Sequence, residues 1–235
     1  MRVISSRTSD DDRRPRRGTG ARAALGVVLL AAVGACAADE PPPRPELRWV
    51  DGEPTGALEA DPWVQAVREA EFAYAWAASV ADFSLPALTS TWRDFAVRNA
   101  ASQVEFDVVH RTPRIHVGPQ AVLPLAVDVS EDGRRAEVAA CVGAPETRPP
   151  VDDGNRWPNV GVYSVELGDD GHRRITGVGL PLSPYVLPDG AVLTPEYCDP
   201  LSIPRAVFVP EPDLEALSKK GRDDVVLPSA SPSPS

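Results

Sequence analysis

The chain has 235 residues, enough for one large domain or two small ones, and its 43% hydrophobic content is ordinary for a protein with a buried core. Its net charge is −10; residues 1–35, with seven Arg and three Asp, contribute +4, which leaves about −14 for the rest. So acidic a chain repels nucleic acids and anionic lipid head groups, and we exclude nucleic acid from its expected partners.

The first 35 residues have the order of a bacterial export signal. Basic residues up to Arg22 precede an uncharged run over residues 23–35, which is shorter than the roughly 20 residues that a membrane span needs. The run ends in Val33-Gly34-Ala35-Cys36, which resembles the lipobox of bacterial lipoproteins. In such a motif the small residues give the peptidase access, and the resemblance implies that the thiol of Cys36 accepts the diacylglycerol.

We therefore expect a signal peptide over residues 1–35 and a lipid on Cys36 that holds the protein at the extracytoplasmic face of the cell membrane. The alternative is that Cys36 is a chance small hydrophobic residue. Arginine pairs at positions 13–14 and 16–17 leave both the general secretory and the twin-arginine routes open. Residues 36–57 are rich in proline and predict an extended spacer, in which Trp49 and Val50 could dock on the domain.

The sequence predicts a long helix from Asp61-Pro62 to Asp82, because Asp can cap a helix, Pro suits its first turn, and no Gly or further Pro follows. One apolar stripe consists of Trp63, Val67, Ala70, Tyr74, Ala77 and Ala81. Phe72 and Trp76 lie on a different side. Either the helix is sandwiched between two layers, which we favour, or Phe72 and Trp76 form a patch for a partner.

A second helix is predicted from about residue 84, with Leu88, Trp92, Phe95, Ala96 and Asn99 at steps of three and four. The periodicity then changes. Alternating segments and turn residues predict two β-hairpins, one over residues 123–142 and one over residues 160–180. Further strands are expected at residues 104–109 or 115–117, and at 205–209.

Helices followed by antiparallel strands predict an α+β fold, with the N-terminal helices packed on a curved antiparallel sheet. We expect one domain over residues 58–210 and, because residues 211–235 are poor in apolar side chains, a disordered tail. The helix that begins Asp-Pro-Trp-Val-Gln-Ala-Val-Arg at residue 61, the Ala-Asp-Phe-Ser turn at 81–84 and the hairpins resemble bacterial lipoproteins with a nuclear-transport-factor-like domain.

That resemblance covers about residues 58–182 and implies a cone-shaped α+β fold, similar to ketosteroid isomerases, whose sheet curls around a long helix and leaves an apolar pocket. Tyr74, Trp92 and Phe95 are the expected pocket residues. Since the superfamily contains isomerases, hydrolases, dehydratases and many non-catalytic domains, the fold does not decide the function.

Two cysteines remain beside Cys36. Cys141 ends a predicted strand, and Cys198 lies in Glu-Tyr-Cys-Asp-Pro. An even pair outside the cytoplasm predicts a disulfide. The alternatives are two buried free thiols or a metal pair, but two cysteines without a neighbouring histidine make a poor metal site. We predict no metal and no cofactor.

No catalytic signature emerges. His110 and His116 flank two arginines in a predicted loop, which we take to be a solvated connection, and His172 lies in a turn. An isomerase site needs a carboxylate in an apolar pocket beside a tyrosine or a protonated acid. Tyr74, Asp82 and Asp107 are nominal candidates, but Asp82 is expected to end the helix and Asp107 to face water, so we assign no catalytic residue.

Three functions stay open. The favoured one is a non-enzymatic, lipid-anchored protein that binds a small apolar ligand or a cell-envelope partner. The second is an isomerase-type or hydrolase-type enzyme that uses the same pocket. The third is a structural accessory lipoprotein with a filled core. The residues that line the pocket would discriminate among them.

Overall fold

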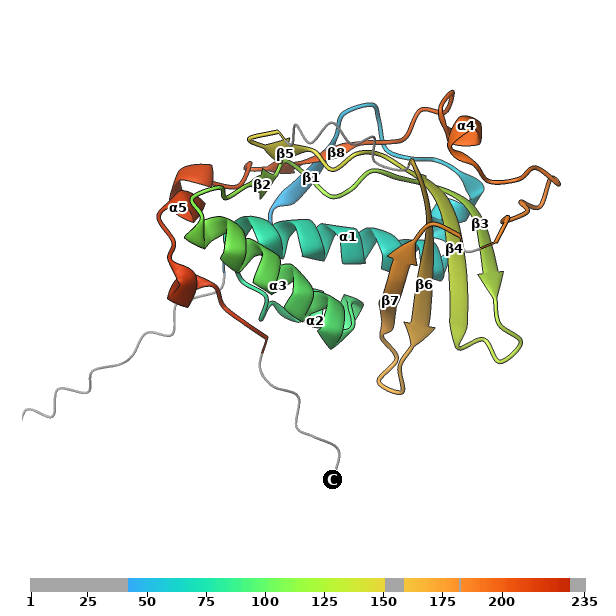
Figure 1. Cartoon of the computed structure of the whole chain (residues 1–235). Helices are drawn as coiled ribbons and strands as arrows, with labels where there is room; N and C mark the ends of the chain where they lie inside the picture. The colour runs from blue at the N-terminus through green and yellow to red at the C-terminus, as the bar shows by residue number, and fades with distance from the viewer. Residues whose placement is uncertain (1–41, 151–158, 182, 229–235) are drawn as a thin grey trace, which may run out of the picture. The chain divides into compact units, whose positions relative to one another are not determined.

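The computed structural model of the chain describes residues 42–150, 159–181 and 183–228. The predicted signal peptide and Cys36 lie outside these residues. Within the described ranges, no helix has both the length and the apolar character that crossing a membrane requires. Helices and antiparallel sheets make up the fold, which confirms the predicted α+β class (Figure 1).

The long helix α1 spans Pro62–Val80, after a 3₁₀ turn at Ala57–Ala60. The Asp61 side chain accepts hydrogen bonds from the backbone N–H groups of Trp63 and Val64, so the predicted N-cap is confirmed. The helix ends at Ala81, which has a φ of 54°. Asp82 then accepts from the backbone and hydroxyl groups of Ser84 in a tight turn, as a helix-ending residue would.

The second predicted helix is two helices, α2 (Pro86–Thr91) and α3 (Asp94–Val109). Trp92 separates them because its backbone is extended and forms a bridge to Ile175 of the sheet. Residues 104–109, expected as a possible strand, belong to α3, whose helical period continues past Asn99. The other expected position holds the short strand β2 (Ile115–His116).

Both predicted hairpins are confirmed. They form one antiparallel sheet in the order β3-β4-β6-β7, with β3 at Val122–Val129, β4 at Arg135–Val142, β6 at Val160–Leu167 and β7 at Arg173–Gly179. The register shifts between Pro124 and Ala126 and again between Ser164 and Val165. Such bulges bend a strand and increase its twist.

The two faces of this sheet are covered by different parts of the chain. The first half of α1 packs on one face, where Val67 meets Val138 and Tyr163 in a common core cluster. The other face is covered by the segment after residue 183, which includes the short helix α4 (Pro195–Cys198). A disulfide joins Cys141 of β4 to Cys198 of α4, with Cα atoms 5.6 Å apart, so the predicted pair is confirmed.

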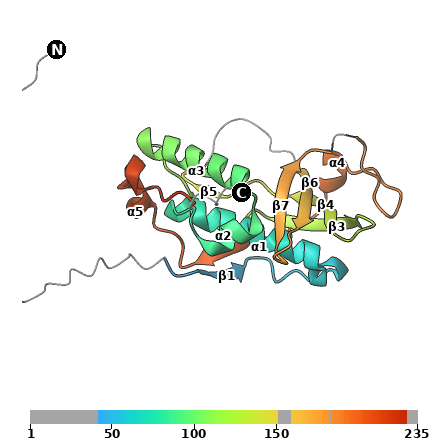
Figure 2. The same ribbon diagram turned by 90° about the horizontal axis from the view of Figure 1, so that it is seen from below.

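A second antiparallel pair lies on the far side of α1 from α3 (Figure 2). It joins β1 (Glu46–Trp49) to β8 (Ala206–Val209), while β2 pairs with β5 (Thr147–Arg148). Part of the predicted spacer over residues 36–57 is therefore a strand. Proline-rich composition did not prevent pairing because the four residues of β1 contain no proline.

The alternative of a partner patch on α1, formed by Phe72 and Trp76, is not supported for Phe72. Phe72 is buried, and its ring packs edge-on against Phe208 of β8 with centroids 5.3 Å apart. Trp76 is half-buried against the same ring at 5.9 Å. The helix is sandwiched, as favoured from the sequence, because β8 covers the side on which both aromatic residues lie.

The tail predicted as disordered over residues 211–235 also differs from the structure up to residue 228. Helix α5 (Leu214–Ser218) and a 3₁₀ turn (Arg222–Asp224) place Leu217 and Val225 in the core with α1 and α3. Val226 then bridges to Asp82. A few well-spaced apolar side chains suffice to fix a segment that is polar on average.

Candidate functional site

The candidate site is a pocket of about 670 Å³ that α1, α3, β2 and β7 enclose together with the loops before β3 and β5. Three smaller pockets, of about 230, 250 and 480 Å³, lie around residues 44–59 and the loops at Pro119 and Pro204. The larger pocket opens to solvent and combines aromatic walls with ionisable groups. These features are typical of small-molecule sites.

Glu71 is the central ionisable group of the pocket. It lies on α1 between the cluster that covers the sheet and the cluster beneath α2 and α3, and only 5% of its surface is exposed. Burial raises the pKa of its carboxyl group to about 7, and among the described residues no cation offsets this rise. Near neutral pH the group therefore exists in both protonation states.

Tyr163 of β6 approaches Glu71 from behind the pocket. Its hydroxyl is fully buried next to the Glu71 carboxyl group, and it lowers the pKa of Glu71 against the larger effect of burial. The hydroxyl has no hydrogen-bond partner of good geometry among the described residues, so the two side chains are neighbours without a formed hydrogen bond. Burial, followed by the Glu71 charge, raises the pKa of Tyr163, which keeps the phenol neutral.

Tyr74 lies one turn beyond Glu71 on the same helix face. Its ring is 5.7 Å from Trp92 and 5.8 Å from His116, measured between centroids. Burial, and to a smaller degree the charge of Glu71, raises its pKa. The Trp92 indole donates a 2.8 Å hydrogen bond to the backbone oxygen of Ala70, which fixes the aromatic wall next to Glu71.

His116 completes the inner part of the pocket. Its backbone N–H donates a 2.8 Å hydrogen bond to the hydroxyl of Ser79 in α1, which ties β2 to the helix. Burial lowers the pKa of its imidazole to about 4, so the ring is neutral at physiological pH. A neutral imidazole can donate or accept a proton without bringing a charge into the pocket.

The mouth of the pocket carries the remaining polar groups. Asp107 and Gln103 project from α3 and are joined by a 3.1 Å hydrogen bond. Arg114 lies exposed in the loop before β2. Phe95, with 76% of its surface exposed, forms an apolar rim with Val178 of β7. The mouth of the pocket therefore combines polar groups with an exposed apolar rim.

The structure brings the three expected pocket residues, Tyr74, Trp92 and Phe95, to this one site. Asp107 also lines the pocket, although we expected it to face water on a strand; it is part of a helix instead. Asp82 does not line the pocket. Of the three histidines only His116 does, whereas His110 and His172 are exposed elsewhere.

Glu71 is the residue that sequence reasoning missed. It is four residues after Val67 and three before Tyr74, which places it on the apolar stripe of a predicted helix. A carboxylate at such a position is either buried or faces a pocket. That signal was present in the sequence.

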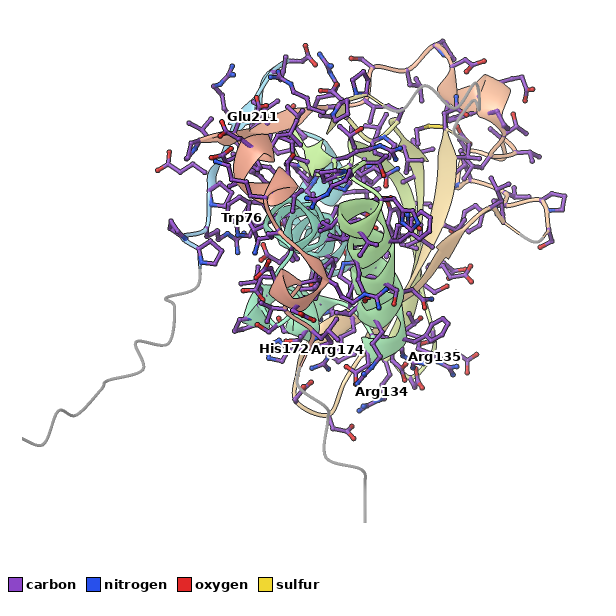
Figure 3. All side chains as sticks on the ribbon, turned by 60° about the vertical axis from the view of Figure 1, so that its left-hand side comes forward. Trp76, Arg134, Arg135, His172, Arg174 and Glu211 are labelled. Atoms are coloured by element: carbon purple, nitrogen blue, oxygen red, sulfur yellow. A yellow bond between two sulfur atoms is a disulfide. The ribbon has the colours of Figure 1, made fainter. Side chains whose placement is uncertain are left out.

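The described residues offer no alternative metal centre or basic patch. No group of three or more His, Cys, Asp or Glu among them could hold a metal ion. Figure 3 labels four basic side chains, Arg134, Arg135, His172 and Arg174, near the turns of the two hairpins. Arg134 pairs with Asp169 at 2.5 Å and Arg174 with Asp170 at 2.6 Å, so acidic neighbours neutralise this end of the molecule.

Comparison with known proteins adds little to this geometry. No family model matches the sequence, and no curated protein matches it significantly. Among solved structures, the intermembrane-space region of the chloroplast protein ARC6 aligns with 60% of this chain and 99% of its own length, at 15% identity and a TM-score of 0.30. A likeness at that level carries no argument about fold or function.

Proposed function

We propose that this protein holds a small, largely apolar molecule in the pocket between α1, α3 and β7. The observation that carries the proposal is an open pocket of about 670 Å³ with aromatic walls and a buried carboxyl group at its inner end. A filled core would have left no such space, so the accessory-lipoprotein alternative is less favoured. The partner alternative is weakened, because Phe72 is buried and Trp76 is half-buried.

The cellular setting is part of the same proposal. The Val-Gly-Ala-Cys motif at residues 33–36 supports a lipid on Cys36 and a position at the extracytoplasmic face of the membrane. The Cys141–Cys198 disulfide agrees with an oxidising compartment. We further propose that the sheet and helices form a nuclear-transport-factor-like cone; the two bulges and the pocket beside α1 support this arrangement.

A direct test is to incubate the full chain with bacterial lipid extracts and to identify the bound material by mass spectrometry. Ala96 lines the pocket from α3, so Ala96→Trp should fill the entrance and abolish the bound species. Arg98→Trp adds the same side chain at an exposed position of the same helix outside the pocket and should bind as the wild type does. An empty wild-type pocket, or equal loading of all three proteins, contradicts the proposal.

A second candidate function is proton transfer on the bound molecule. The arrangement that favours it is a carboxyl group with a pKa of about 7 beside Tyr74, with a neutral His116 next to that tyrosine. A carboxylate base and a nearby hydrogen-bond donor are what an isomerase-type site requires. Glu71 would remove a proton next to a carbonyl group, while Tyr74 or His116 would donate a hydrogen bond to the carbonyl oxygen.

This candidate is tested with cyclohex-3-enone, whose conversion to the conjugated ketone is followed by ultraviolet absorbance. Wild type should accelerate the conversion, and Glu71→Gln should lower the rate at least about 100-fold, since general-base catalysis contributes that much. If both proteins give the uncatalysed rate, the hypothesis of proton transfer is contradicted, while the proposal of ligand binding is unaffected.

A further inference from the structure

We infer that the ligand of this pocket is an organic cation, a small ammonium compound with an apolar body, whose positive charge lies against Glu71 and beside the rings of Tyr74 and Trp92. The inference rests on the proposed ligand-binding function and names the chemical class of the ligand.

The first argument is the absence of a counter-ion. Charged side chains that are buried in proteins are almost always paired. Glu71 is 5% exposed and faces the pocket, yet among the described residues no arginine, lysine or protonated histidine offsets its charge. A cationic ligand would supply the positive counter-ion that Glu71 lacks among the described residues.

The second argument is the aromatic wall beside this carboxyl group. Tyr74 and Trp92 lie 5.7 Å apart with their planes at 44°, and the hydrogen bond from Trp92 to Ala70 holds the indole in place. Aromatic faces attract cations, most strongly where water is excluded, and tetraalkylammonium groups are bound in such sites. Phe95 and Val178 at the rim would contact the apolar body.

The groups that face the pocket from each element agree with this assignment. From β2 comes the neutral His116 and from α3 the second carboxylate, Asp107. Behind the pocket, Tyr163 of β6 is also neutral. Arg114 is the single cation that lines the pocket among the described residues, and it is exposed at the mouth. Arg68 of α1 acts on Tyr163 and is paired with Glu59.

A neutral ligand and a cation predict opposite pH dependences. A neutral carbonyl compound would accept a hydrogen bond from protonated Glu71, so its affinity would fall as the pH rises through 7. A cation favours the ionised carboxylate, so its affinity would rise over the same interval. An anion would be repelled at the inner end at high pH. The sign of the pH effect therefore identifies the ligand class.

The test uses three probes of the same shape: phenyltrimethylammonium, the neutral tert-butylbenzene and the anionic 4-tert-butylbenzoate. Their binding to the full chain is measured by calorimetry near pH 5.5 and near pH 8.5. None of the three probes changes its protonation state over this range, so any pH effect arises in the protein. We expect the cation to bind about tenfold more tightly at the higher pH, as ionisation of a group with a pKa of about 7 allows.

The variants separate charge from shape. Glu71→Gln keeps the size of the side chain and should abolish the pH effect, so that the cation binds no better than the neutral probe. Asp107→Asn, at the mouth, should weaken the cation only about two- to threefold at both pH values, as a more exposed and screened charge does. Ala96→Trp, which fills the entrance of the pocket, should bind none of the probes.

The outcomes distinguish this inference from the proposed function. Tighter binding of the neutral or anionic probe overturns the cationic ligand but leaves a ligand-binding pocket. Cation binding that is unchanged in Glu71→Gln overturns the role of Glu71. Failure of all three probes, together with an empty pocket after incubation with lipid extracts, overturns both proposals.

Discussion

At the scale of single residues, the position of Glu71 determines the chemistry of the pocket. Its helix turn points it away from solvent, and the neighbouring Ala70 and Ala73 are too small and too apolar to solvate a charge. The pKa of about 7 therefore follows from burial. The same burial acts on His116 in the opposite direction, because its charged form is the protonated one, and lowers its pKa to about 4.

The raised pKa of Glu71 makes a prediction about stability. A carboxyl group with a folded-state pKa of about 7 and an ordinary unfolded value near 4.5 contributes fully below pH 4.5, and this contribution is lost as the pH rises to 7. Relative to wild type, Glu71→Gln should therefore gain about 3 kcal/mol in free energy of unfolding between pH 4.5 and pH 8. Urea unfolding at both pH values measures the gain.

The control for this experiment is Glu131→Gln, a carboxylate exposed in the turn between β3 and β4. The difference in free energy of unfolding between this variant and wild type should be the same at both pH values within about 0.5 kcal/mol, since substitutions at exposed positions have small effects. A Glu71 variant that behaves like this control would show that water or a cation reaches the Glu71 carboxyl group.

At the scale of elements, most of the long pieces were predictable because each carries a local signal. The cap and proline at residues 61–62 fixed the start of α1, and turn glycines such as Gly133, with a φ of 65°, fixed the hairpins. The break at Trp92 and the short strand β1 were not predictable, since both depend on partners far along the chain, Ile175 and β8. Local periodicity contains no information about such pairing.

The docking of β8 on α1 is tested by Phe208→Ala. Phe208 is 2% exposed and packs against Phe72 and Trp76, so its truncation should cost about 3 to 5 kcal/mol of unfolding free energy. Val209→Ala is the matched control, because that side chain is next in the strand and 41% exposed. Its cost should be below about 1 kcal/mol. Equal losses of unfolding free energy in the two variants would mean that the backbone pairing of β8, and not the aromatic cluster, holds β8 on α1.

The capping of α1 is tested by Asp61→Ala. The aspartate accepts the backbone N–H groups of Trp63 and Val64, and its loss should lower the free energy of unfolding by about 1 kcal/mol. Asp223→Ala, at an exposed position of the 3₁₀ turn, should change it by less than about 0.5 kcal/mol. Chemical unfolding at neutral pH compares the two variants. Similar losses of unfolding free energy would show that the Asp61 side chain does not stabilise α1 as a cap.

At the scale of the whole molecule, the disulfide fastens the segment after residue 183 to the sheet face opposite α1. The sequence predicted this bond from compartment and parity of cysteines. Replacing both cysteines by alanine should lower the free energy of unfolding by about 4 kcal/mol, given a loop of 57 residues in the chain-entropy model. Urea unfolding of the double variant against wild type measures the loss, and an unchanged midpoint would contradict a closed bond.

The pocket itself is a property of the assembled molecule. The sequence identified its aromatic residues through helical spacing and a family resemblance, but not the way in which His116, from a short strand, and Asp107, from α3, join Glu71. Those residues are far apart along the chain, and only the packing of β2 and α3 on α1 brings them together. A pocket is therefore harder to predict than the elements that enclose it.

The central feature of the pocket is the buried Glu71 carboxyl group without a counter-ion at its inner end. The most direct measurement is a nuclear magnetic resonance titration of the Glu71 side-chain carboxyl carbon in the full chain, assigned with Glu71→Gln. We expect a midpoint at about pH 7, which falls when phenyltrimethylammonium is bound. A midpoint near the ordinary glutamate value of about 4.3, unchanged by the cation, would contradict this expectation.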